Sequence, residues 1–170
     1  SKIQNIVISG LGGSAIGGDL LRSYLADEIT IPVAVSRHYF LPEYVNERSL
    51  VVVSSYSGNT EETISSHKDA VKRKAKILCI TSGGAVKRLA LQKKQPVIEI
   101  PGGLPPRAAL GYSFFPTLVV LSRLGFIKSK KKEIYETISL LKKKAAAYGN
   151  AESQDNRALR VAEALQGKLP

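Results

Sequence analysis

The sequence has no methionine and no tryptophan, and it has one cysteine, Cys79. A single thiol rules out an internal disulfide and fits a reducing compartment, so a cytoplasmic location is expected. Because Cys79 lies within the apolar run "KILCIT", we expect an inert core thiol and not a nucleophile. The lack of even an initiator methionine indicates that the chain is a piece of a longer protein.

The sequence also lacks long apolar runs. None approaches the length of a membrane-spanning helix, and no secretory signal opens the chain, so no membrane partner is expected. The 170 residues are 44% hydrophobic and 23% charged, a composition that allows a packed core and argues against disorder. The length suits one domain with an appendage.

Acidic residues are scarce: 14 aspartates and glutamates stand against 25 lysines and arginines, a net charge of +11. Residues 1–127 carry 15 basic and 9 acidic residues, and residues 128–170 carry 10 and 5. In the second part Ile134, Ile138 and Leu141 recur at helical spacing, which predicts an amphipathic helix with the lysines on its solvated side. The few aromatic residues among these lysines, and the lack of a zinc-finger or RNA-recognition motif, argue against a nucleic acid partner.

Short apolar runs alternate with helical patterns along the chain. Strands are predicted at 3–9, 31–36, 50–55, 76–81 and 96–100. Helices are predicted at 14–26, 60–74, 84–94, 107–124 and 131–148, and a connecting helix after Asn150. Because the strands are continuously apolar, we expect helices on both faces of a parallel sheet. The predicted fold is α/β, a three-layer αβα sandwich with a five-stranded parallel sheet, whose ligands bind at the carboxyl ends of the strands.

The first predicted strand ends in the glycine-rich turn "GLGGSA". This turn matches the G-x-G-x-x-A pattern of dinucleotide-binding proteins, but the second strand ends in "VSRHY" and not in the acid that would bind a ribose. Arg37 would suit a 2′-phosphate, so NADP stays open. Alternatively, Gly12 and Gly13 bring the backbone close to an anion at a helix start near Ser14. The turn can also serve packing alone, with Ser14 as an ordinary N-cap.

The third predicted strand ends in a turn rich in hydroxyl groups, "SSYSGNTEET". It holds Ser54, Ser55, Ser57 and Thr60, and Gly58 gives the backbone freedom. Capping a helix needs one hydroxyl, whereas hydroxyls and backbone N–H groups together at a helix start solvate a phosphate. No lysine follows the glycine, so this is not a nucleoside triphosphate loop. The turn therefore predicts a phosphate site.

The spacing of Asn59 and Glu62 within this turn is that of a capping box, which predicts a helix start at about Thr60.

The "SxSGxT" pattern after a strand is similar to that of SIS (sugar isomerase) domains. The longer strings "GLGGSAIGGDL", "SRHY", "SSYSGNTEET", "ITSGG" and "PPRAALGY" resemble the bifunctional phosphoglucose/phosphomannose isomerases, from Asn5 to about Phe126. That resemblance implies a flavodoxin-like SIS domain at 1–127. It also implies that 128–170, a basic amphipathic helix and a linker, lead to a second SIS domain beyond this chain.

The resemblance also implies which residues bind substrate. Ser55, Ser57 and Thr60 would bind the phosphate of a hexose 6-phosphate, with Gly13 and Ser14 beside the sugar. Arg107 would lie near the carbonyl and hydroxyl being interconverted, where a guanidinium stabilises an enediolate. Such a reaction calls for no metal and no cofactor, and a homodimer through SIS domains is expected.

A base for the proton transfer is harder to find. His67 falls within a predicted helix on a polar face, where we expect it to be solvated, and His38 follows the second strand without an evident partner. Glu61 and Glu62 would repel a phosphate if they pointed toward it, so helix capping explains them better. By resemblance, the base lies beyond Pro170.

Two other functions fit the same sequence. One is the sugar-phosphate-sensing SIS domain of a transcription regulator, which the basic charge favours and the "PPRAALGY" segment opposes. The other is a single-domain sugar-phosphate isomerase that completes its site across a homo-oligomer.

Overall fold

The computed structural model describes residues 2–153 and 156–168 of the chain. The strands are β1 (Asn5–Ser9), β2 (Val33–Ser36), β3 (Ser49–Ser55), β4 (Lys76–Thr81) and β5 (Val97–Glu99). The helices are α1 (Gly12–Tyr24), α2 (Glu61–Lys72), α3 (Gly84–Gln92), α4 (Leu110–Arg123), α5 (Lys131–Gly149) and α6 (Arg157–Leu165). Every predicted strand and helix is therefore present, with ends shifted by a few residues.

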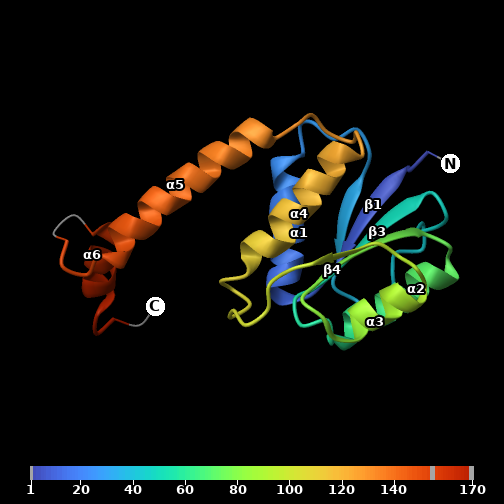
Figure 1. Cartoon of the computed structure of the whole chain (residues 1–170), viewed down its shortest axis with the longest axis horizontal. Coiled ribbons are helices and arrows are strands. Elements are labelled where there is room, and N and C mark those ends of the chain that lie inside the picture. The colour runs from blue at the N-terminus through green and yellow to red at the C-terminus, as the bar shows by residue number, and fades with distance from the viewer. Residues whose placement is uncertain (1, 154–155, 169–170) are drawn as a thin grey trace. The chain divides into compact units, whose positions relative to one another are not determined.

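The five strands form one parallel sheet in the order β2-β1-β3-β4-β5. Helices α1 and α4 pack side by side over one face, and α2 and α3 cover the other, as Figure 1 shows. The predicted three-layer αβα sandwich is confirmed. The strand order reverses between β1 and β3, and in doubly wound sheets this switch point is where ligands bind.

The core explains why the strands read as continuous apolar runs. All seven residues of β3 are buried, and Val51, Val52 and Val53 have no exposed surface. Cys79 of β4 is buried beside Val53 in register, and burial raises the pKa of its thiol to about 12. Such a thiol carries almost no thiolate at neutral pH, so its predicted inertness follows from the packing.

The chain divides into two compact units, one ending at Lys128 and one beginning at Ser129. The second unit contains α5 and α6, and Asn156 is its one buried residue among those described. Helix α5 forms where the amphipathic pattern predicts it, but Ile138 and Leu141 are 41% and 55% exposed. No helix of the described chain is long and apolar enough to cross a membrane.

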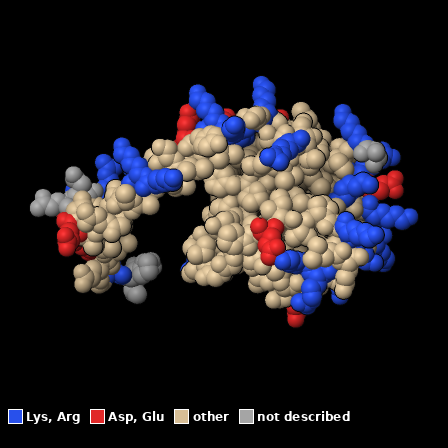
Figure 2. All heavy atoms as spheres, in the orientation of Figure 1, with Lys and Arg blue, Asp and Glu red and all other residues tan. Residues whose placement is uncertain are grey.

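Charge is distributed unevenly over the first unit. In the view of Figure 2, lysine and arginine side chains crowd its edge near α2, whereas the surface over α1 and α4 is largely free of charge. Ile16, Leu20 and Tyr24 of α1 are each nearly half exposed.

Candidate anion site at the switch point

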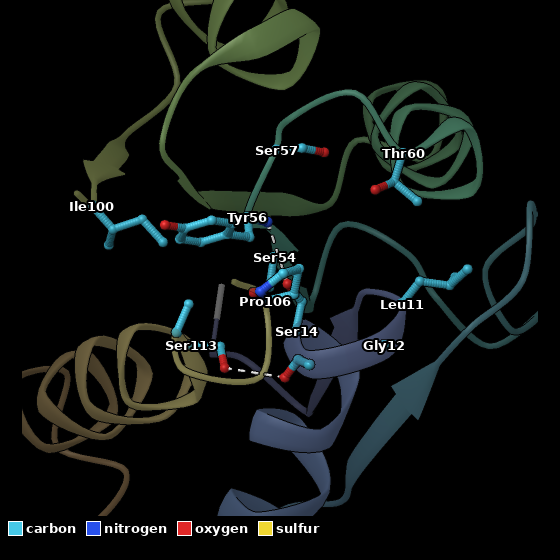
Figure 3. A pocket seen from close by; sticks show the side chains of 12 residues that line it. Leu11, Gly12, Ser14, Ser54, Tyr56, Ser57, Thr60, Ile100, Pro106 and Ser113 are labelled. Atoms are coloured by element: carbon cyan, nitrogen blue, oxygen red, sulfur yellow. Dashed lines mark hydrogen bonds between the residues drawn. The ribbon is translucent and has the colours of Figure 1, made fainter. Parts of the chain in front are cut away.

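A cavity of about 330 Å³ lies where β1 and β3 end, at the switch point of the sheet. Its walls come from the glycine-rich turn, the hydroxyl-rich turn and the segment between β5 and α4, as Figure 3 shows. The lining residues are Leu11, Gly12, Gly13, Ser14, Ser54, Tyr56, Ser57, Thr60, Ile100, Pro106, Ala109 and Ser113. The two turns that the sequence singled out separately therefore meet at one site.

Some side chains of the hydroxyl-rich turn hold its backbone in shape, and others face the cavity. Ser55 is 2% exposed; its Oγ accepts from the Gly58 N–H (3.1 Å) and donates to Thr60 Oγ1 (3.2 Å). Ser55 thus braces the turn from behind and is not among the lining residues. Ser57 and Thr60 line the cavity, and neither hydroxyl donates to an acceptor within the described chain. Both keep a proton to give to a ligand.

Helix α2 starts at this turn without a side-chain cap. The predicted capping box is wrong: Asn59 Oδ1 accepts from the Ala85 N–H (3.0 Å) of the next helix, and Thr60 at the N-cap position makes no capping bond. Asn59 therefore joins two turns. The leading N–H groups of α2 keep no side-chain acceptor in the described chain, which suits them to bind an anion.

Gly58 is required by contact as well as by conformation. Its φ is +69°, and a Cβ there would lie 1.9 Å from the carbonyl oxygen of Gly83. The Val86 N–H also donates to the Gly58 carbonyl (2.9 Å). The hydroxyl-rich turn is consequently locked against the turn between β4 and α3.

The glycine-rich turn forms the opposite wall. Helix α1 begins at Gly12, two residues earlier than predicted, so Ser14 lies in the first turn of the helix and is not its N-cap. Ser14 Oγ accepts from the Tyr56 N–H (3.3 Å), which ties the two turns together. A Cβ on Gly13 would lie 3.0 Å from the Pro106 carbonyl oxygen, so this glycine admits the segment that carries Arg107.

Arg107 lies in an exposed turn just before α4. Pro106 and Ala109 on either side of it line the cavity, whereas the Arg107 side chain does not. The structure thus brings the backbone of the predicted arginine segment to the site without placing the guanidinium inside.

Charged side chains near the two turns pair with other residues and do not line the cavity. Arg37, the residue that kept NADP open, pairs with Asp19 of α1. Glu61 accepts from the Tyr39 hydroxyl (3.4 Å), and the negative charges of Glu62 and Glu61 help to raise the pKa of that phenol. No carboxylate, imidazole or amine is among the lining residues. The cavity therefore offers uncharged donors to an anion and no general base.

The two histidines stay apart from the cavity. His38 is exposed, and the prediction that His67 is solvated is wrong. His67 is 1% exposed, and its Nε2 lies 2.6 Å from Oε1 of Gln95, which follows α3. The histidine faces α3 because α2 presents this side to the core, which its polar sequence neighbours concealed. Among residues 2–153 and 156–168 no three metal-binding side chains cluster.

The sequence reasoning missed Tyr56, Ile100 and Ser113 as lining residues. Tyr56 stands between two predicted site serines, so its position was the available signal. Ser113 Oγ donates to the Gly13 carbonyl (3.3 Å) from α4, a contact one hundred residues away in the chain that no local pattern reveals.

Known proteins match this chain in the region that contains both turns. The sequence profile of the SIS domain matches residues 1–99. A bifunctional phosphoglucose/phosphomannose isomerase of Caldicellulosiruptor bescii is 48% identical over 99% of this chain and 50% of its own length. One from Thermoplasma acidophilum is 40% identical over 81% of this chain and 41% of its own length.

Solved structures show the same fold. A putative phosphosugar isomerase of Clostridium difficile 630 superimposes with a TM-score of 0.68 at 20% identity, over 88% of this chain and 46% of that one. The chain spans about half the length of the curated relatives that it resembles most in sequence.

Proposed function

The chain belongs to the SIS-domain family, and we propose that it is the amino-terminal half of a bifunctional phosphoglucose/phosphomannose isomerase. Its cavity would hold the phosphate of a hexose 6-phosphate. One observation carries the proposal: two helices begin without side-chain caps at an uncharged cavity, and the hydroxyls of Ser57 and Thr60 that line it donate to no described residue. Helix starts and hydroxyls of this kind bind phosphate through uncharged donors.

The reaction proposed for the intact protein fits an anchor of this kind. Glucose 6-phosphate and mannose 6-phosphate differ at carbon 2, and both give fructose 6-phosphate through the same enediolate. A site that grips the phosphate at carbon 6 leaves carbons 1 and 2 free for proton transfer. It also accepts both epimers, because the phosphate is remote from the carbon at which they differ.

We assign the roles as follows. Ser57 and Thr60 donate to the phosphate, Ser55 holds the turn in shape, and Gly13 and Ser14 lie beside the sugar. Arg107 stabilises the enediolate once its exposed side chain turns toward the substrate.

The catalytic base is assigned to the part of the protein beyond Pro170, because the cavity lining supplies no carboxylate or imidazole. In this proposal residues 128–170 connect the first SIS domain to a second one. We also propose that the intact protein is a cytoplasmic homodimer.

Calorimetry of the 170-residue chain tests the site. The wild type is expected to bind both inorganic phosphate and fructose 6-phosphate. The double variant Ser57→Ala, Thr60→Ala should lose at least about 100-fold in affinity for both, because two hydrogen bonds to a charged group disappear.

A matched control removes two hydroxyls elsewhere, with Ser23→Ala near the end of α1 and Ser139→Ala on α5, both exposed. The control should bind like the wild type. Unchanged affinity in the Ser57, Thr60 variant would refute the proposed site.

A further inference from the structure

Tyr56 connects every segment that forms the cavity. Its backbone N–H donates to Ser14 Oγ in the glycine-rich turn (3.3 Å). Its carbonyl accepts from both Ser82 Oγ (2.6 Å) and the Ser82 N–H (3.1 Å), after β4. Its phenol oxygen accepts from the Leu104 N–H (2.9 Å), and its ring lines the cavity on the side of Ile100 (Figure 3).

The bond to Leu104 matters because of the segment to which Leu104 belongs. Residues 101–108 are all exposed, and they carry Arg107. Among the described residues, the Leu104–Tyr56 bond is the one hydrogen bond that joins 101–108 to another segment. An exposed segment with so few hydrogen bonds to its surroundings is weakly held in place. The Leu104–Tyr56 bond therefore contributes much of what fixes its position.

The chain between the tether and the arginine is stiff. Pro105 and Pro106 stand between Leu104 and Arg107, and each proline fixes its own φ. The Ala108 and Ala109 N–H groups donate to the Pro105 and Pro106 carbonyls (2.9 and 3.2 Å). Fixing the position of the Leu104 backbone therefore also restricts the position of the Arg107 backbone.

We propose that Tyr56 is a positioning residue, whose hydroxyl couples the phosphate turn to the segment that carries Arg107. This inference rests on the proposed function. A phosphate held by Ser57 restrains the turn next to Tyr56, and the phenol then holds Leu104 and, through the two prolines, the guanidinium. Tyr56 acts through Arg107 and does not itself meet the reacting atoms.

Tyr56→Phe isolates this role, because it removes one oxygen. The ring stays, and the three backbone bonds to Ser14 and Ser82 do not depend on the phenol. We expect affinity for inorganic phosphate within about twofold of wild type, since phosphate tests the turn alone. Affinity for fructose 6-phosphate should fall about 3- to 10-fold, because Arg107 is then held less firmly at the sugar.

A double-mutant cycle separates positioning from general damage. With Arg107→Ala already present, Tyr56→Phe should change fructose 6-phosphate affinity by less than about twofold, because the residue that it positions is gone. Tyr135→Phe on the exposed face of α5 is the matched control and should be silent in both backgrounds. Equal effects of Tyr56→Phe with and without Arg107 would overturn the proposal.

Hydrogen exchange supplies a readout that needs no ligand. In Tyr56→Phe the Leu104 amide and its neighbours in 101–108 should exchange faster, while β3 amides keep their protection. Unchanged exchange at Leu104 would refute the tether. A wild-type chain that binds neither phosphate nor fructose 6-phosphate would instead refute the proposed function and, with it, the coupling to substrate.

Discussion

The two turns that face each other across the cavity follow neighbouring strands and enter helices of 13 and 12 residues, yet they are held by different means. The glycine-rich turn has little side-chain bulk, and Gly13 lets the Pro106 backbone approach. The hydroxyl-rich turn is braced by Ser55 and locked by Gly58 against Gly83. The glycine-rich turn allows close approach of another segment, whereas the hydroxyl-rich turn presents hydrogen-bond donors, and the proposed phosphate site uses both.

The largest expected difference between the turns concerns their glycines. Gly58→Ala should lower the free energy of unfolding by about 3 kcal/mol or more, because its Cβ would overlap the Gly83 carbonyl in a left-handed conformation. Gly12→Ala, with φ +50° and nothing within 4 Å, should cost about 1 kcal/mol. Urea denaturation of both variants measures the difference, and equal losses would show that the two turns are equally constrained.

A smaller difference should appear in binding. Ser57→Ala removes a hydroxyl that donates to no described residue, so affinity for inorganic phosphate should fall about 10-fold. Ser14→Ala should change it by less than about threefold, because Ser14 Oγ serves the Tyr56 N–H and is assigned to the sugar. Calorimetry with phosphate and then with fructose 6-phosphate tests this division. A larger loss for Ser14 with phosphate alone would reverse the roles of the two turns.

The smallest effect concerns the ion pairs on the two helices. Asp69 of α2 is 14% exposed; it accepts from Arg73 Nε (2.9 Å) and from the Leu41 N–H (3.0 Å). Burial acts to raise the pKa of this carboxyl, but the bonds from Arg73 and Leu41 outweigh it and hold the pKa below the usual value. Asp19 of α1 is 34% exposed, and its partner Arg37, which follows β2, is 45% exposed.

Asp69→Asn should therefore cost about 1 kcal/mol of unfolding free energy at neutral pH, and Asp19→Asn less than half of that. Because the pKa of Asp69 is lower in the folded state than in the unfolded state, its ionised carboxylate stabilises the fold. This contribution to the free energy of unfolding is fully present above the unfolded pKa, near 4, and is lost as the pH falls through the folded pKa. Denaturation curves at pH 7 and at pH 2 to 3 should thus differ less for Asp69→Asn than for wild type. An equal pH dependence would exclude this role for Asp69.

Most of the fold could be predicted from local sequence. Continuous apolar runs such as "LVVVSS" indicate strands covered on both faces, and turns rich in glycine or hydroxyls mark the strand ends at which a site forms. These signals are local because alternation of strand and helix is set by short-range periodicity. The composition of the hydroxyl-rich turn likewise predicts an anion site, which the binding measurements test.

The tertiary structure decided which groups of that turn are available. Ser55 and Ser57 are equivalent in sequence, but one is buried as a brace and the other lines the cavity. Asn59 caps a neighbouring turn, His67 reaches Gln95, and Tyr56 reaches Leu104, each across more than twenty residues of chain. Such pairings depend on how strands are ordered and helices packed. Side-chain direction at a turn is fixed by these distant partners, so residue type alone could not reveal it.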